Sequence, residues 1–200
     1  MKRTPNRIKL LPLLESAFFT AQEGKKKGVP VRMLDYFCEQ GVIERIGRGV
    51  YRSSEAQLDD EVQWEDLAIT VQTIPEGVIC LLSALCYYEL TDEIMREYWI
   101  AVPNAQKAPK RKHTKIVRMR NMTLGLEKAQ IGKWKVKIFN KERAVVDAFR
   151  YLDKETAICV LARYLQKTDT HRPNIRLLMQ YARALRTSIE PYLLALNTVT

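Results

Sequence analysis

The chain has few of the residues that build metal centres and disulfide frameworks. Its 200 residues include four cysteines and two histidines. No two cysteines form a CxxC pair, and His113 and His171 lie far apart in polar surroundings. A zinc site needs closely spaced ligands, so we expect neither a metal site nor a cofactor. The cysteines lie in apolar, helix-like contexts and are expected to act as small buried hydrophobes.

Long hydrophobic runs are also absent. No apolar run approaches the roughly eighteen residues that a membrane-spanning helix requires. The first sixteen residues combine basic residues with a few leucines, but their apolar part is too short and too interrupted for a signal peptide. We therefore expect a cytoplasmic protein with no membrane partner.

Catalytic motifs are missing as well. The chain has no P-loop, no GxSxG elbow and no HExxH sequence. Ser83 lies in an apolar stretch, which favours a core hydroxyl over a nucleophile. Asp66, Glu89 and Asp147 are isolated carboxylates, and Asp147 is expected to cap a helix or to pair with an arginine such as Arg143, four residues earlier. We predict no catalytic residue, and a metal-dependent nuclease, which needs converging carboxylates, is a minor alternative.

Charge is abundant and unevenly distributed. The chain has 33 Lys and Arg against 23 Asp and Glu, for a net charge of +10. Residues 1–55 hold 11 basic and 6 acidic residues, and residues 56–100 hold 1 and 10. Residues 101–143 hold 13 and 2. An acidic block therefore separates two basic ones, and the basic blocks favour attraction to nucleic acid.

The most informative segment is residues 28–52, GVPVRMLDYFCEQGVIERIGRGVYR. Pro30 suits the first turn of a helix, and Gly41 suits its C-terminal cap. Two strand-like runs follow, residues 42–46 and 50–52, around a Gly-Arg-Gly turn. A helix followed by a basic hairpin is typical of a winged helix-turn-helix, in which the helix enters the major groove of DNA.

One side of this helix is polar. Arg32, Tyr36 and Gln40 recur at helical spacing on the face opposite Leu34 and Phe37. Arginine can bind the O6 and N7 atoms of guanine, and basic residues of the hairpin suit phosphate contacts. The predicted DNA-binding residues are Lys25, Lys26, Lys27, Arg32, Tyr36, Gln40, Arg45, Arg48 and Arg52. The alternative for each is an ordinary solvated surface.

The preceding residues complete such a module. Residues 7–16 are leucine-rich with helical spacing, although Pro12 interrupts them. Thr20 and Glu23 form a capping box, which predicts a second helix starting near Ala21. Residues 53–61 are polar and aperiodic. We therefore predict a winged helix-turn-helix domain over residues 1–55 and a second domain over residues 56–200.

The second domain is predicted to be larger, with a small sheet and a helical C-terminal third. Helices are expected at residues 62–73, 78–90, 141–151, 155–165, 174–186 and 189–196. Strands are expected at residues 98–102, 115–120 and 134–139, with an exposed basic loop over 103–114. The fold class is therefore α+β.

This second domain carries further basic residues. They form a candidate second basic surface, for nucleic acid or an acidic protein, that consists of Lys110, Arg111, Lys112, Lys133, Lys135, Lys137, Arg172, Arg176 and Arg183. The alternative is a solvated sheet face whose lysines discourage edge-to-edge association.

Four segments together resemble the AbiEi antitoxins of bacterial abortive-infection systems. They are GVIERIGRGVYR (41–52), PEGVICLLSALCYYELTDE (75–93), KERAVVDAFRY (141–151) and LLMQYARALRTSIEPYL (177–193). The resemblance implies a winged helix that binds inverted repeats in the protein's own promoter and represses the operon. The start of the third helix, Pro30-Val31-Arg32, departs from the Ser or Thr common in that family, so no base preference is transferred.

The same resemblance implies that the C-terminal domain counters a nucleotidyltransferase toxin of the AbiEii type, with or without direct contact. In such type IV toxin–antitoxin systems the antitoxin need not form a stable complex with the toxin. The sequence thus predicts an antitoxin and transcriptional repressor whose partners are double-stranded DNA and that toxin. The alternative is a protein-interaction module, or another DNA-binding regulator, without an antitoxin role.

Overall fold

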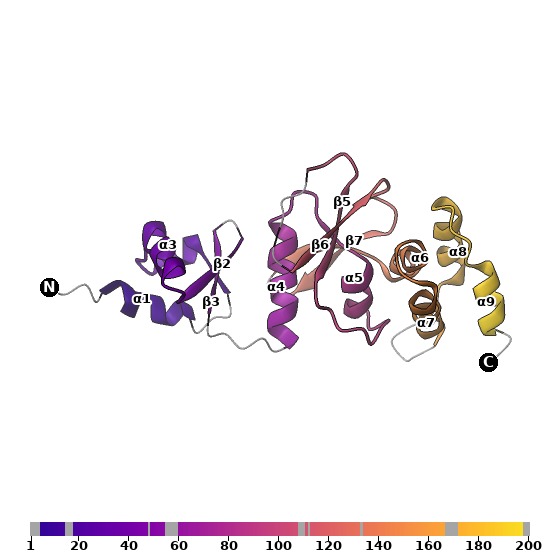
Figure 1. Cartoon of the computed structure of the whole chain (residues 1–200), viewed down its shortest axis with the longest axis horizontal. Coiled ribbons are helices and arrows are strands. Elements are labelled where there is room, and N and C mark those ends of the chain that lie inside the picture. The colour runs from indigo at the N-terminus through magenta and orange to yellow at the C-terminus, as the bar shows by residue number, and fades with distance from the viewer. Residues whose placement is uncertain are drawn as a thin grey trace. The chain divides into compact units, whose positions relative to one another are not determined.

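The computed structural model describes residues 5–14, 18–47, 49–54, 60–107, 111, 113–132, 134–166 and 172–197. The chain divides into two compact units (Figure 1). The first comprises Met1–Thr73 and Ile131–Trp134, and the second comprises Ile74–Gln130 and Lys135–Thr200. Both contain helices and strands, which confirms the α+β class. The division after residue 73 differs from the boundary predicted at residue 55.

The first unit contains three short helices, a three-stranded sheet and a further helix. Its elements are α1 (Pro5–Leu14), β1 (Phe18–Thr20), α2 (Ala21–Lys26), α3 (Val31–Glu39), β2 (Ile43–Gly47), β3 (Val50–Ser53) and α4 (Asp60–Gln72). The sheet has the order β1-β3-β2 and is antiparallel throughout. Helix–strand–helix–helix–strand–strand is the order expected of a winged helix. Strand β1 was not predicted.

Eight apolar side chains form the core of this unit. They come from α1, the sheet, α3 and the α2–α3 connection, and are Leu10, Leu13, Phe19, Val29, Leu34, Phe37, Ile43 and Tyr51. The rings of Phe19 and Tyr51 stack across the β1–β3 pair with centroids 5.7 Å apart. Because Leu34 and Phe37 both project from one side of α3, the core fixes that helix and leaves its opposite side exposed.

Local signals set the ends of α2 and α3. The Thr20 hydroxyl accepts a hydrogen bond from the Glu23 backbone N–H at 3.2 Å, and the Glu23 carboxylate accepts one from the Thr20 N–H at 2.6 Å. The predicted capping box is thus confirmed. Gly41 has φ of +69°, and its N–H donates to the Cys38 carbonyl at 3.1 Å. This left-handed residue ends the helix, as predicted.

The second unit places a five-stranded sheet beside a group of helices. Its elements are β4 (Val78–Ile79), α5 (Leu81–Tyr87), β5 (Tyr98–Pro103), β6 (Thr114–Met119), β7 (Leu126–Ile131), β8 (Trp134–Phe139), α6 (Lys141–Tyr151), α7 (Lys154–Leu165), α8 (Ile175–Ala184) and α9 (Glu190–Asn197). The strand order is β6-β5-β4-β8-β7. Strand β4 is antiparallel to β5 and parallel to β8. The helices α6, α7, α8 and α9 gather toward the C-terminal end (Figure 1).

Two sequence predictions in this unit are incorrect. Residues 78–90 were expected to form one helix, but Val78 and Ile79 form a strand and the helix begins only at Leu81. These two β-branched residues are buried between neighbouring strands, which suits a central strand. Strand β7 was not predicted either, because residues 126–131 lack an alternating apolar pattern.

A buried ion pair connects α6 with the loop between β6 and β7. Arg143 is fully buried, and its Nε donates to Asp147 Oδ2 at 2.7 Å, as the sequence predicted. The guanidinium also donates to the carbonyls of Leu124 and Asn121, at 2.9 and 3.1 Å. One buried cation therefore holds both a helix and a loop.

Ser83 was expected to be a core hydroxyl and not a nucleophile. Ser83 is fully buried, and its hydroxyl accepts from the Trp99 N–H at 2.9 Å and donates to the Met95 sulfur at 3.0 Å. It is therefore a core hydroxyl, as predicted.

In the described part of the chain, every helix is too short or too polar to cross a bilayer.

Candidate nucleic-acid interface

Helix α3 presents an exposed face made of the residues predicted to meet DNA. Arg32, Tyr36 and Gln40 are all exposed, and the Tyr36 side chain keeps 48% of its surface accessible. Tyr36 lies edge-on to Phe37, with ring centroids 5.7 Å apart, so the buried neighbour limits its range of orientations. The helix thus offers a guanidinium, a phenol and an amide on one side.

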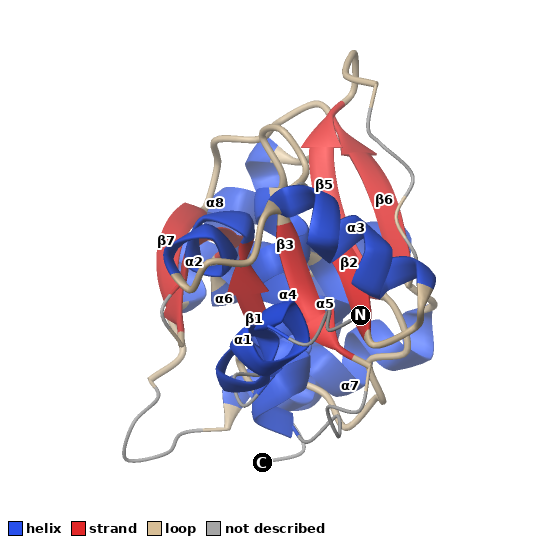
Figure 2. Ribbon diagram, turned by 90° about the vertical axis from the view of Figure 1, so that its left-hand side faces the viewer, coloured by secondary structure: helices blue, strands red, loops and turns tan. Residues whose placement is uncertain are grey.

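The hairpin of β2 and β3, which we call the wing, lies beside α3 (Figure 2). Gly49 in its turn has φ of +74°, the left-handed conformation that a tight hairpin needs. Arg45 of the wing is half exposed, and its Nη1 lies 3.8 Å from Asp35 Oδ1 of α3. Its guanidinium also lies 5.9 Å from the centre of the Tyr51 ring. Arg45 therefore spans from the wing to the helix.

Three consecutive lysines end α2. Lys25 and Lys26 occupy the last turn, Lys27 is the C-cap, and all three are exposed. Their charge complements the negative end of the helix dipole. It also leaves three ammonium groups at the surface of the same unit as α3, where phosphates could be bound.

Arg52 is placed differently from the prediction. Its side chain is only 16% exposed and forms ion pairs with Glu44 Oε2 at 2.7 Å and with Asp66 Oδ2 at 3.3 Å. Two carboxylates already neutralise the guanidinium, so we leave Arg52 out of the proposed interface. Arg48 lies outside the described residues.

Two exposed residues of α3 were not among those predicted to meet DNA. Val31 opens the helix with 49% of its surface accessible, and Asp35 follows one turn later. The start of a recognition helix is the part that meets base edges, and an apolar side chain there can contact the methyl group of thymine. Helical spacing places both on the same side of α3 as Arg32, and this spacing could have been used to predict them.

Uncharged groups lie beneath this face. Burial raises the pKa of the Cys38 thiol, and the neighbouring Asp35 carboxylate raises it further. Burial likewise raises the pKa of the Tyr51 phenol. Both groups therefore stay neutral near pH 7 and add no charge to this face.

The candidate second basic surface is only partly visible. Lys110, Lys112 and Lys133 lie outside the described residues, and Arg111 is half-buried. Lys135 and Lys137 are exposed on β8, alternating with buried Val136 and Ile138 as predicted. Arg172, Arg176 and Arg183 are exposed at or near α8. The structure thus places two arginines on one helix, a third shortly before it, and two lysines on one strand.

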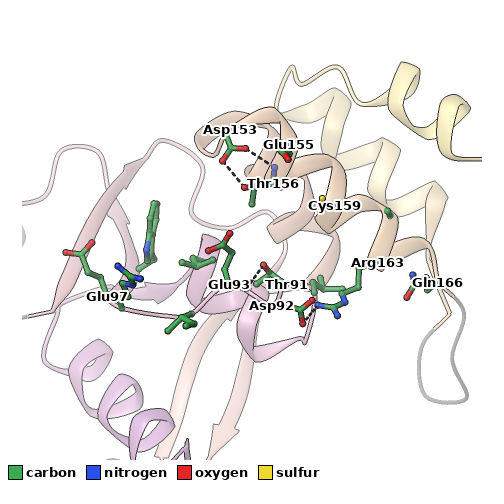
Figure 3. A pocket seen from close by; sticks show the side chains of 16 residues that line it. Thr91, Asp92, Glu93, Glu97, Asp153, Glu155, Thr156, Cys159, Arg163 and Gln166 are labelled. Atoms are coloured by element: carbon green, nitrogen blue, oxygen red, sulfur yellow. Dashed lines mark hydrogen bonds and ion pairs between the residues drawn. The ribbon is translucent and has the colours of Figure 1, made fainter.

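A groove runs between α7 and the irregular segment 90–97 of the second unit (Figure 3). Its volume is about 1230 Å³. Leu82, Ile94, Trp99 and Ala162 supply apolar lining, and Ile94 is 73% exposed. Five carboxylates line it against two arginines: Asp92, Glu93 and Glu97 of the acidic block, and Asp153 and Glu155 at the start of α7.

Two of these carboxylates have structural partners. Asp92 pairs with Arg163 at 2.8 Å, and this carboxylate raises the pKa of the guanidinium. Asp153 caps α7 and accepts from the backbone N–H and hydroxyl of Thr156, both at 2.8 Å, which lowers its pKa. Cys159 of α7 was expected to be buried, but it is exposed and lines the groove.

Carboxylates of the chain were also considered as metal ligands. Within the described ranges, no group of three or more His, Cys, Asp and Glu side chains is arranged to hold a metal ion. The candidate carboxylates of the sequence have other positions: Asp66 and Asp147 form ion pairs with arginines, and Glu89 is exposed.

Comparison with known proteins bears directly on the first unit. The model of the AbiEi antitoxin transcriptional regulator family matches residues 9–54, which run from α1 to the end of the wing. No curated protein matches the chain. The matched segment contains α2, α3 and the wing, and thus the basic and exposed residues described above. The resemblance predicted from sequence is thereby confirmed over residues 9–54, which match the AbiEi antitoxin transcriptional regulator family.

Proposed function

We propose that this protein is a DNA-binding repressor that controls its own toxin–antitoxin operon through the winged helix. The observation that carries the proposal is the exposed face of α3, which the core holds beside the basic wing within the segment that matches the family. A helix of this kind enters the major groove while the wing lies along the backbone.

The residues divide into two roles. Arg32, Tyr36 and Gln40 on α3 would contact base edges, since arginine binds guanine bidentately and amides bind adenine. Arg45 and Arg48 of the wing, with Lys25, Lys26 and Lys27 of α2, would contact phosphates. Phosphate contacts fix the register of the protein on DNA without reading the sequence.

The direct test measures binding of the full-length protein to the DNA upstream of its own gene at several salt concentrations. Each phosphate that a lysine or arginine neutralises releases counterions, so log K should fall linearly with log salt, with a slope of about −0.9 per contact. We expect tighter binding to this DNA than to an unrelated duplex of equal length. Equal affinity for the two duplexes, or a slope near zero, would contradict the proposal.

Arg32→Ala is expected to weaken binding to the upstream DNA by about 1–3 kcal/mol and to relax the preference at one base pair. The matched control is Lys26→Ala, which should weaken binding to all sequences alike and reduce the salt slope by about one. Fluorescence anisotropy with both duplexes separates the two effects. If Arg32→Ala behaved like Lys26→Ala, Arg32 would be a phosphate contact.

The proposal extends to the second unit, which would counter a nucleotidyltransferase toxin. Support comes from the family match of the first unit and from the resemblance of residues 75–93, 141–151 and 177–193. The test is co-expression with the nucleotidyltransferase encoded beside the gene, if the operon contains one. Arg32→Ala should abolish repression and keep the rescue of growth, because the two activities would reside in different units.

A protein-interaction role without an antitoxin activity is the competing function. Two surfaces of the second unit can be altered to distinguish the antitoxin role from this competing function. They are the acidic groove and the arginines of α8. Glu93→Lys with Glu97→Lys reverses two charges of the groove. Arg176→Glu with Arg183→Glu reverses two charges of α8. All four side chains are exposed, so both variants should fold. Loss of rescue in either variant assigns the antitoxin role to that surface, and rescue that never occurs supports the competing function.

A further inference from the structure

The exposed face of α3 carries more acid than base. Between Val31 and Glu39, its exposed charged side chains are Arg32, Asp35 and Glu39. Two carboxylates against one guanidinium make a poor surface for phosphates, which are themselves negative. Non-specific attraction must therefore come from the lysines of α2 and from the wing, and the acidic residues of α3 need another explanation.

Asp35 lies where base contacts are made. It follows Arg32 by three residues and so lies next to it on the helix surface. Arg32 lies in the first turn of α3 and Asp35 is the fifth of its nine residues, one turn after Val31 at the end of a recognition helix that approaches base edges. Glu39 lies a further turn along, at the last helical position. The two carboxylates therefore carry the same charge at different positions along the helix axis.

The wing holds Asp35 in position. Arg45 Nη1 lies 3.8 Å from its Oδ1, and Arg45 is itself anchored by a hydrogen bond from Nε to the Gly47 carbonyl at 3.4 Å and by the Tyr51 ring. Both side chains of the pair remain about half exposed, so one carboxylate oxygen and its lone pairs stay available to a ligand. An ionised carboxylate can only accept hydrogen bonds.

We infer that Asp35 is a specificity-determining residue that selects a cytosine in the operator. This inference rests on the proposed DNA-binding function. In the major groove cytosine presents the N4 amino donor, whereas guanine presents two acceptors and thymine presents one. Adenine has a donor at N6, but the neighbouring N7 acceptor would repel the second carboxylate oxygen. An acceptor-only side chain therefore favours cytosine and disfavours the other three bases.

The same residue suppresses binding to unrelated DNA. Its negative charge repels the phosphate backbone, and it holds the Arg45 guanidinium that could otherwise bind a phosphate. Specificity gained through repulsion of wrong partners is a general device. Removing the charge of Asp35 should thus raise affinity for unrelated DNA and lower the preference for the operator.

The experiment begins with selection of bound duplexes from a randomised library by the full-length protein. Single-base variants of the selected sequence are then measured by fluorescence anisotropy with the native protein and with Asp35→Asn. The native protein should lose about tenfold or more in affinity when one cytosine becomes guanine or thymine. Asp35→Asn should lose that preference and bind unrelated DNA more tightly than the native protein does.

Glu39→Gln is the matched control, because it removes the same charge from the same face one turn later. It should also bind unrelated DNA more tightly, but it should keep the cytosine preference. A second measurement needs no variant: a duplex in which that cytosine is replaced by 2-pyrimidinone lacks only the N4 amino group. The native protein should bind this duplex about as weakly as the guanine variant.

The outcomes separate the inference from the function on which it rests. If the native protein selects a sequence and Asp35→Asn keeps the same preference at every position, Asp35 does not determine specificity. If 2-pyrimidinone binds as well as cytosine at every selected position, no carboxylate contact to N4 exists. If the native protein selects no sequence at all, the proposed repressor function itself is wrong.

Discussion

Arg143→Met is expected to lower the free energy of unfolding of the second unit by about 3–5 kcal/mol, the range for removing one partner of a buried ion pair. Asp147 would remain 1% exposed with a single partner, Arg150, at 2.6 Å. The carbonyls of Asn121 and Leu124 would also lose their charged donor. Urea unfolding followed by tryptophan fluorescence measures the loss.

Two further variants test this explanation. Arg150→Met removes the other arginine on Asp147, but its side chain is 30% exposed and the loss should be smaller, about 1 kcal/mol or less. In Arg143→Met with Asp147→Leu, no charge is left buried, and part of the stability should return. If the double variant were no more stable than the single one, the carbonyl contacts rather than the ion pair would dominate.

Leu34→Ala is expected to destabilise the first unit by about 2–5 kcal/mol, as truncations of buried leucines do. Leu34 is fully buried and belongs to the core that holds α3. Although Leu34 does not face outward, DNA affinity should fall as well, because a loosened α3 no longer presents Arg32 and Tyr36 in fixed positions. Calorimetric unfolding and anisotropy, at a temperature where the variant is folded, measure the two effects.

The close packing of α2 on Leu34 supplies an internal control. A Cβ added to Gly24 would lie 3.3 Å from Leu34 Cδ1, a tight contact in the native protein. Once Leu34 is truncated that contact disappears, and Gly24→Ala should then stabilise helix α2 by about 0.8–1 kcal/mol. The Leu34→Ala and Gly24→Ala double variant should therefore be more stable than Leu34→Ala alone. The opposite order would mean that the cavity collapses onto Gly24.

Features with local causes could be predicted from the sequence. The Thr20–Glu23 capping box, the left-handed Gly41 and the glycines of the wing each act within a few residues. The face of α3 followed from helical spacing alone. The i, i+4 pair of Arg143 and Asp147 could be predicted for the same reason. The burial that makes this pair important could not.

Features that depend on distant partners were missed. Strand β1 has only three residues and is defined by its pairing with β3, as Phe19 opposite Tyr51 shows. Val78 and Ile79 form a strand because neighbours from later in the chain cover them. Arg52 looked like a free wing cation, since nothing in its own segment shows that Asp66 would approach from α4.

Asp35 escaped prediction for a different reason. Its exposure on α3 follows from the same spacing as that of Arg32, but an acidic side chain was not expected on a surface predicted to face DNA. Only the 3.8 Å approach of Arg45 shows that the wing positions it. The net basic charge of residues 1–55 therefore gave no sign that one face of α3 carries acidic side chains.

The ion pairs of Arg52 also decide how the first unit could be exchanged between proteins. Arg52 in β3 contacts Asp66 in α4, so a chimaera joined after Ser54 would separate the two groups. The guanidinium would then keep only Glu44, on the opposite strand of the wing. A transplant extending through Thr73 would carry the whole first segment of the unit and keep this link. The natural exchangeable module is therefore longer than the segment that we propose to read DNA.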